Sequence, residues 1–289
     1  MITYENVRDA AAEAYRRCLV DIPKDVLEAL KAAREKETSS DAIWAFDNML
    51  LAVETAKKQN MTFCEDIGVP SMDVRIGTET KVPRDMEKAL NDGMALMSKN
   101  MGIRNIDLTM PVDKKTKTPG PIIRWESMVG KDYVELIAVP KGGGTEPKSA
   151  AKTLDPSTPA YIKKWLLDTI AEIGPIACPP YTIGLGIGGN LALVGQLSML
   201  ATLRPVNMWN KDPEAAKMEQ ELTDAVNQLG WGPMGVGGKT SCLAVHIEQY
   251  GTSPRWSPVG FTLKCWPNRR GVVKITNDGK IQVLDYPEE

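Results

Sequence analysis

Three cysteines lie in segments rich in the residue types that support chemistry. Cys64 precedes two carboxylates in TFCEDIG, Cys178 precedes two prolines in ACPPYTIG, and Cys265 precedes a tryptophan and two arginines in LKCWPNRRG. Three single thiolates from distant loops can ligate a [4Fe–4S] cluster, which leaves one iron open as a Lewis acid. Spacing alone favours the alternative interpretation, three unrelated buried thiols.

The sequence excludes several other kinds of centre. It contains no C-x-x-C pair, which argues against a zinc ribbon or a ferredoxin-type site. Its one histidine, His246, excludes a histidine-rich metal site and a Ser-His-Asp triad within this chain. Cys18 lies in a helical pattern and Cys242 alternates with apolar residues, so both are expected to fill core space.

A glycine-rich segment follows Cys178 and offers an alternative function. Gly184, Gly186 and Gly189 fit the G-x-G-x-x-G pattern of dinucleotide-binding folds. Such folds place an acidic residue about 20 residues further on, within a βαβ unit. Residues 190–211 contain no acidic residue, so a nucleotide-dependent oxidoreductase is only weakly supported.

The elements that must position these residues form a mixed α and β (α+β) pattern. Apolar periodicity predicts helices at 22–37, 39–60, 156–174 and 212–230, and strands at 71–77, 134–140, 241–250, 259–265 and 272–286. The last strand segment contains Asp278-Gly279, a hairpin turn signal. We expect a helical N-terminal region, 1–60, followed by one continuous α/β body, 61–289, with C-terminal strands.

Composition indicates an ordinary globular protein and excludes some partners. Hydrophobic residues make up 43% and charged residues 25% of the 289 residues, and the net charge is −2. This balance gives no reason to expect nucleic acid or a membrane as a partner. The five cysteines and the absence of an apolar leader pattern predict a reducing, cytoplasmic location.

Several ordered motifs resemble those of one known family, the class I iron–sulfur fumarate hydratases and L-tartrate dehydratases. CEDIG is similar to the family's Cys-Gln-Asp-Thr-Gly, PKGGGTE to its Lys-Gly-Gly-Gly-Ser-Glu, and ACPPYTIGLGIGG to its Cys-Pro-Pro loop. The segment IPKDVLEALKAAREKE is similar to the family's opening helix. Two later segments, GPMGVGGKTS and KCWPNRR, resemble its last two motifs. The resemblance covers nearly the whole chain and corresponds to the alpha subunit, or N-terminal half, of these enzymes.

The resemblance implies a cofactor and a catalytic residue. It implies that Cys64, Cys178 and Cys265 hold a [4Fe–4S] cluster, with the glycines after Cys178 making room for it. It also implies that Asp66 is the general acid that protonates the leaving hydroxyl. The alternative for Asp66 is a turn aspartate, since D-x-G is common turn chemistry. Glu65 stands at the substrate-side position where the family has glutamine.

The resemblance further implies the residues that bind a small dicarboxylate. Arg104 matches the family's substrate arginine, and a guanidinium suits a carboxylate; a solvated surface charge is the alternative. Gly142 and Gly143 belong to a loop whose N–H groups would bind the other carboxylate, unless it is a plain glycine turn. Lys239 could add positive charge.

The sequence also departs from the family pattern. Ser253 replaces the usual histidine before the third cysteine, and Arg255 nearby could supply charge in its place. The family's second half is missing from the given sequence, which implies a separate beta subunit and an α2β2 heterotetramer. The expected function is a hydro-lyase, fumarase or tartrate dehydratase, acting on fumarate/malate, tartrate or a related acid. The alternative is a non-catalytic or repurposed iron–sulfur protein of the same family.

Overall fold

The computed structural model describes residues 1–118 and 120–288 and divides the chain into two compact units. The first unit contains Met1–Pro23, Val53–Gly142 and the chain from Arg269 on, and the second contains Lys24–Ala52 and Gly143–Asn268. Each unit has its own sheet and its own core. This division differs from the expected regions 1–60 and 61–289, because the first sixty residues are shared between both units.

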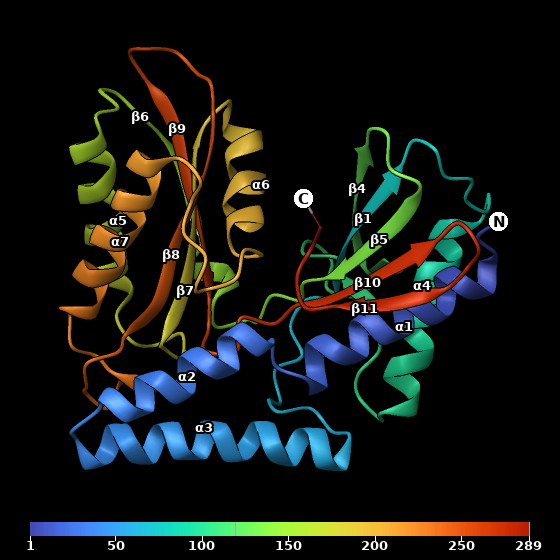
Figure 1. Cartoon of the computed structure of the whole chain (residues 1–289), viewed down its shortest axis with the longest axis horizontal. Coiled ribbons are helices and arrows are strands. Elements are labelled where there is room, and N and C mark those ends of the chain that lie inside the picture. The colour runs from blue at the N-terminus through green and yellow to red at the C-terminus, as the bar shows by residue number, and fades with distance from the viewer. Residues whose placement is uncertain (119, 289) are drawn as a thin grey trace. The chain divides into compact units, whose positions relative to one another are not determined.

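The first unit is a five-stranded sheet with two helices along one face (Figure 1). The strand order is β11-β10-β5-β1-β4; β1 and β4 are parallel, and the other neighbouring pairs are antiparallel. Its helices are α1 (Tyr4–Val20) and α4 (Met86–Asn100). Its strands are β1 (Ser71–Gly77), β4 (Ile122–Met128), β5 (Tyr133–Ala138), β10 (Gly271–Thr276) and β11 (Ile281–Leu284), with a separate hairpin of β2 (Leu108–Thr109) and β3 (Lys117–Thr118).

Small residues allow α1 and α4 to pack closely. Thr3 and Asn6 form a capping box that begins α1. On α4, a Cβ atom at Gly93 would lie 2.1 Å from the carbonyl oxygen of Arg8 on α1, so only glycine fits there. The sequence patterns did not predict α4, whose glycine is needed for this close packing.

The other face of this sheet carries charged side chains. Strand alternation directs Met72 and Val74 into the core and Asp73 and Arg75 to the opposite face. There the Nη1 of Arg75 donates to the fully buried carboxylate of Glu135 at 3.1 Å. Neighbouring Arg124 binds both carboxylate oxygens of Asp73, at 2.9 and 2.7 Å. This charged face holds buried carboxylates that are stabilised by guanidinium partners.

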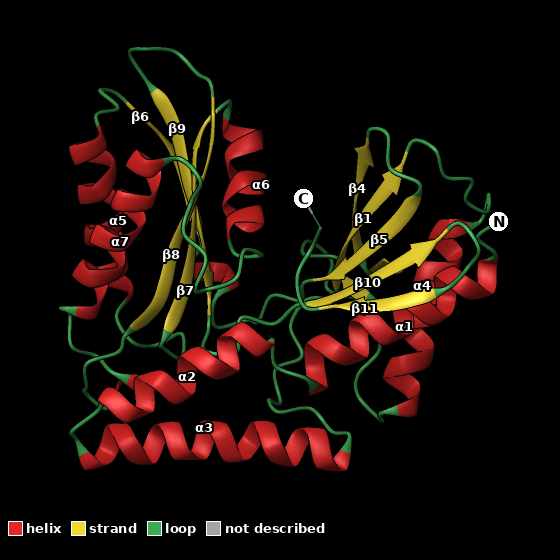
Figure 2. Ribbon diagram, viewed as in Figure 1, coloured by secondary structure: helices red, strands yellow, loops and turns green. Residues whose placement is uncertain are grey.

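The second unit is a four-stranded sheet covered on both faces by helices (Figure 2). The strand order is β6-β9-β7-β8, in which only β7 and β8 are parallel. α5 and α7 cover one face, and α6 covers the other. The elements are α2 (Lys24–Lys36), the first part of α3 (Ser40–Gln59), β6 (Ala150–Leu154), α5 (Pro159–Ile173), β7 (Tyr181–Gly188), α6 (Leu191–Ala201), α7 (Pro213–Asn227), β8 (Cys242–Tyr250) and β9 (Ser257–Lys264).

The glycines that follow Cys178 pack against a helix, which corrects the expectation that they make room for a cofactor. They lie in β7, where Ile183 and Leu185 face the core on the side of α5 and α7. A Cβ atom at Gly184 would lie 2.0 Å from the carbonyl oxygen of Ser198, and one at Gly186 would lie 2.4 Å from that of Val194, both on α6. Gly184 and Gly186 of the glycine pattern therefore serve strand–helix packing.

Several predicted elements are confirmed, together with the α+β fold class. α5 begins where Thr158 accepts the N–H of Tyr161, and it ends before Gly174. The predicted C-terminal hairpin is β10–β11, with Gly279 at φ +84° in the turn. No helix among the described residues combines the length and apolarity needed to cross a bilayer.

Candidate active site

In the second unit, Cys178 and Cys265 lie at the same end of the four-stranded sheet. Cys178 precedes β7 and Cys265 follows β9, and these strands are antiparallel neighbours. The N–H of Trp266 donates to the carbonyl oxygen of Cys178 at 3.1 Å. Two of the three predicted ligands are thus brought together.

The backbone of Cys178 has an unusual conformation. Its φ is +60°, in the left-handed region, which costs a non-glycine residue about 1–3 kcal/mol. Its side chain is exposed, whereas that of Cys242 is fully buried. An exposed thiol held in a strained turn is typical of a functional site, and Cys242 behaves as the core residue that the sequence predicted.

Cys64 belongs to the first unit, in the loop between α3 and β1. Its Sγ lies 3.7 Å from the Oε2 of Glu65, and the preceding N–H, that of Phe63, donates to the carbonyl oxygen of Leu19 at 3.3 Å. Among the side chains that the structure describes, no three or more His, Cys, Asp or Glu come together as a metal-binding group. Cys64 belongs to a different unit from Cys178 and Cys265.

Two hydrogen bonds hold Asp66 within the first unit. Its Oδ1 accepts the N–H of Gly68 at 2.9 Å, which is the turn role considered as an alternative. Its backbone carbonyl oxygen accepts the Nη1 of Arg269 at 2.6 Å. Its Oδ2 lies next to Gly142, where an added Cβ atom would be 2.7 Å from this oxygen. One carboxylate oxygen thus fixes the turn while the other faces the glycine loop.

A short β-bridge joins the Asp66 segment to the glycine loop. The N–H of Val69 donates to the carbonyl oxygen of Lys141 at 2.7 Å, and a Cβ atom at Gly68 would lie 2.7 Å from that same oxygen. Gly68, at φ +75°, also accepts a hydrogen bond from Arg104 through its carbonyl oxygen. Gly68 therefore connects Asp66, through its N–H, with Arg104, through its carbonyl.

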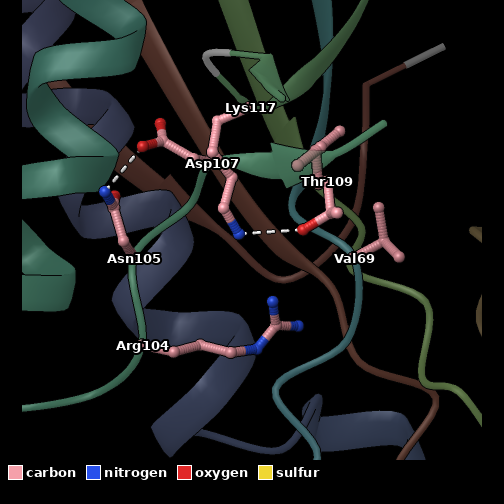
Figure 3. A pocket seen from close by; sticks show the side chains of 7 residues that line it. Val69, Arg104, Asn105, Asp107, Thr109 and Lys117 are labelled. Atoms are coloured by element: carbon pink, nitrogen blue, oxygen red, sulfur yellow. Dashed lines mark hydrogen bonds between the residues drawn. The ribbon is translucent and has the colours of Figure 1, made fainter. Parts of the chain in front are cut away.

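Arg104 lines an open pocket of about 530 Å³ in the first unit, together with Lys117 (Figure 3). The charged ends of both side chains point toward the hollow, and the Nζ of Lys117 donates to the Oγ1 of Thr109 at 2.8 Å. The pocket's carboxylate, Asp107, accepts a hydrogen bond from Asn105 at 2.8 Å. Two cations beside this pocket suit an anionic ligand.

Ser253 and Arg255 lie at the opposite end of the second unit's sheet from Cys265. They precede β9 and Cys265 follows it, and the eight residues of β9 extend over about 25 Å. Ser253 lines a separate pocket of about 470 Å³ next to α5 and α7. Arg255, with 80% of its side chain exposed, pairs with Asp155 at 3.3 Å. Within this chain, the structure does not bring these two residues to the cysteines.

Lys239 has a structural contact in the second unit. Its Nζ donates to the carbonyl oxygen of Lys36 at 2.9 Å, and its backbone N–H donates to both carboxylate oxygens of Glu37 at 2.8 and 3.0 Å. These bonds attach the loop before β8 to the end of α2. The predicted substrate role of Lys239 gains no support from this geometry.

Sequence reasoning missed two cations that the structure places at the site. Arg269 lies within the quoted KCWPNRR motif, and its near-complete burial was the missing information. Lys117 lies in a stretch of lysines and threonines, DKKTKT, that looks like an ordinary solvated loop. Only the turn between β2 and β3 brings Lys117 to face Arg104.

The first unit thus brings together a carboxylate, two arginines and glycine backbone. Residues 8–274 match the family described as Fumarate hydratase (Fumerase). A Methanocaldococcus jannaschii protein, provisionally named L(+)-tartrate dehydratase subunit alpha, is 31% identical over 95% of this chain and 99% of its own length. L(+)-tartrate dehydratase subunit alpha of Escherichia coli strain K12 is 28% identical over 92% of this chain and 89% of its own length. The chain belongs to the fumarate hydratase family, as its motifs predicted.

Proposed function

We propose that this chain is the alpha subunit of a hydro-lyase that reversibly adds water to, or removes it from, a small dicarboxylate such as fumarate/malate or tartrate. The observation that carries the proposal is the convergence on Asp66 of the segments containing Gly68, Arg104, Gly142 and Arg269. Family membership supports the same reaction class. The relatives are named as alpha subunits, and we propose a beta subunit and an α2β2 assembly for this chain as well.

In this function, each residue of the first unit has a separate task. Arg104 binds a carboxylate of the substrate, and Lys117, in the same pocket, adds positive charge for a second anionic group. Gly142, which has no Cβ, allows the substrate to approach Asp66 Oδ2 closely. Asp66 donates a proton to the leaving hydroxyl in dehydration and accepts it back in hydration. The group that acts on the neighbouring carbon is expected in the beta subunit.

We propose Cys64, Cys178 and Cys265 as the ligands of a [4Fe–4S] cluster. The exposed, strained Cys178 beside Cys265 supports the assignment, since thiolate ligands must be accessible to iron. When bound, such a cluster supplies an open iron that acts as a Lewis acid toward the substrate's hydroxyl. Glu65, whose carboxylate lies 3.7 Å from the Cys64 sulfur, would have to be turned away from this thiolate or protonated.

The cofactor is tested by measuring iron and acid-labile sulfide after anaerobic purification. We expect about four of each per chain, lost in Cys178→Ser and kept in Cys242→Ala, a matched cysteine buried in the core. Absence of iron and sulfide in the reconstituted wild type would reject the cluster.

The reaction is tested by coexpressing the chain with its beta subunit and supplying fumarate, L-malate, tartrate or mesaconate. We expect turnover that Asp66→Asn abolishes. A cluster-containing complex without turnover on these acids would instead support a repurposed iron–sulfur protein. Strong activity of the metal-free isolated chain would refute the proposed function.

A further inference from the structure

Arg269 is a buried cation that contacts two segments of the candidate site. Its exposed fraction is 5%, although an arginine is normally solvated. Its Nη1 donates to the backbone carbonyl oxygen of Asp66 at 2.6 Å. Its Nη2 lies beside Gly142, where an added Cβ atom would be 3.3 Å from it and 2.7 Å from Asp66 Oδ2. One guanidinium therefore lies against both the acid's segment and the glycine loop.

Arg269 and Arg104 bind the same short segment, because they donate to the backbone carbonyl oxygens of Asp66 and Gly68 respectively. Burial raises the pKa of Tyr15, and the positive charges of Arg104 and Arg269 both oppose this rise. Tyr15 lies on α1 and is fully buried in the core. Burying a guanidinium costs desolvation free energy, and this cost is offset only where its N–H groups form hydrogen bonds or ion pairs.

We propose that Arg269 is a positioning residue that holds Asp66 in place for proton transfer. It fixes the backbone of Asp66 against Gly142, so that Oδ2 stays aimed at the bare glycine backbone while Oδ1 remains in the turn with Gly68. The proposal deepens the proposed function, and rests on it, because Asp66 is the proton donor there. Arg269 itself exchanges no proton in the reaction.

The geometry requires arginine in particular. The guanidinium is planar, with donors on separate nitrogens, so one nitrogen can bind the Asp66 carbonyl while another packs against Gly142. A lysine carries its donors on a single nitrogen and cannot both bind the Asp66 carbonyl and place a second nitrogen beside Gly142. Arg269→Lys therefore keeps the charge while releasing one of the two segments.

The first experiment measures position directly, on the full chain, by amide hydrogen exchange of the peptide that contains Asp66 and Gly68. We expect exchange in this peptide to be at least about 10-fold faster in Arg269→Lys than in wild type, because a restraint on local opening is removed. The matched control is Arg124→Lys, which disturbs another hydrogen-bonded arginine of the same unit, on the sheet face. Unchanged exchange in Arg269→Lys, or an equal increase in the control, would overturn the proposal.

The second experiment is a double-mutant cycle on the assembled enzyme. We expect Arg269→Lys to lower kcat by about 10- to 100-fold, with KM within about twofold, since a misplacement near 1 Å has such effects. In an Asp66→Asn background, the same substitution should change kcat by less than about twofold, because Arg269 acts through Asp66. Independent, multiplicative losses would refute positioning and indicate a structural role.

The two experiments separate this inference from the proposed function. If no dicarboxylate is turned over by the wild-type complex, the proposed function fails, and hydrogen exchange alone decides whether Arg269 holds the Asp66 segment. If Arg269→Lys does not fold, Arg269→Gln is measured in its place, because glutamine is smaller and needs no buried counter-charge. Its exchange rate is judged by the same criterion.

Discussion

The two carboxylate oxygens of Asp66 have different surroundings, which makes an isosteric substitution informative. In Asp66→Asn the amide oxygen can still accept the Gly68 N–H, so the turn and the thermal unfolding temperature should be preserved. The acid is lost, and general acid catalysis contributes about 10²- to 10⁴-fold to rate. We therefore expect kcat to fall by about that factor at an unchanged Tm. A variant with wild-type kcat would assign Asp66 to the turn alone.

Gly142 tests how closely the glycine loop approaches the acid. In Gly142→Ala the new methyl group would meet Asp66 Oδ2 and the Arg269 guanidinium, so we expect kcat to fall about 10- to 100-fold. The matched control is Gly144→Ala in the same loop, where a Cβ atom would meet nothing within 4 Å. Steady-state kinetics of both variants decide the matter, and equal activities would show that the loop can move away.

Thiol reactivity distinguishes the proposed ligands from the core cysteines. Complete burial raises the pKa of Cys242 and keeps it as an unreactive thiol, whereas Cys178 is exposed. Alkylation of the folded, cluster-free chain at pH 8, read by peptide mass spectrometry, should modify Cys178 and spare Cys242 until denaturant is added. Modification of Cys242 in the folded state would contradict the core that the structure describes.

At the residue scale, the sequence suggested candidate residues but not the contacts that hold them. Motif order identified Cys64, Asp66 and Gly142 as candidates, because those residue types carry recognisable chemistry. Arg269 was missed because burial decides its role, and burial depends on which distant segments meet. Ser253 was proposed because it takes the place of the family's histidine before Cys265, and an extended strand between the two residues takes them to opposite ends of a sheet.

At the element scale, the packing of β7 on α6 depends on glycines. We expect Gly184→Ala to lower the free energy of unfolding by about 1–3 kcal/mol, because a methyl group would overlap the Ser198 carbonyl. Gly195→Ala, on α6 itself, meets open space and should raise it by about 0.5–1 kcal/mol through helix propensity. Urea unfolding of both variants checks the opposite signs. A neutral Gly184→Ala would refute the close packing.

Elements with explicit end signals were predictable, and elements whose glycines serve tertiary packing were not. The cap and closing glycine of α5 and the Asp-Gly turn of the β10–β11 hairpin are local chemistry, which a sequence displays. α4 was missed, and it contains Gly93, a residue that lowers helix propensity. Glycine is nevertheless required there, because the Arg8 carbonyl leaves no space for a side chain at this position. This contact forms only in the folded chain, so the sequence pattern does not show it.

At the scale of the whole molecule, the buried Glu135 makes stability depend on pH. Burial is the largest influence on this carboxyl and raises its pKa above the usual 4.5, despite the opposing Arg75. A raised folded-state pKa means that the stabilisation is complete below about 4.5 and is lost as pH rises through the folded value. The stability of wild type relative to Glu135→Gln should therefore fall over the pH range above about 4.5. Urea unfolding across that range measures it, and a rising difference would contradict the assigned direction.

The division into two units was beyond sequence reasoning. Composition and periodicity describe consecutive stretches, and they suggested a helical front and a continuous body. Each unit is instead assembled from separated stretches, so that the segment from Arg269 on completes a sheet begun near Ser71. Such an arrangement is determined by long-range strand pairing, for which a single sequence contains no local signal.

Gly68 has a consequence for how an enzyme of this kind can change. Its N–H supports the acid and its carbonyl supports the arginine that receives the substrate's carboxylate. In the proposed function, an alteration of Arg104 that suits a new acid also pulls on the backbone that orients Asp66. Selectivity and turnover are therefore linked through one residue without a side chain, and evolution at this site has to adjust both together.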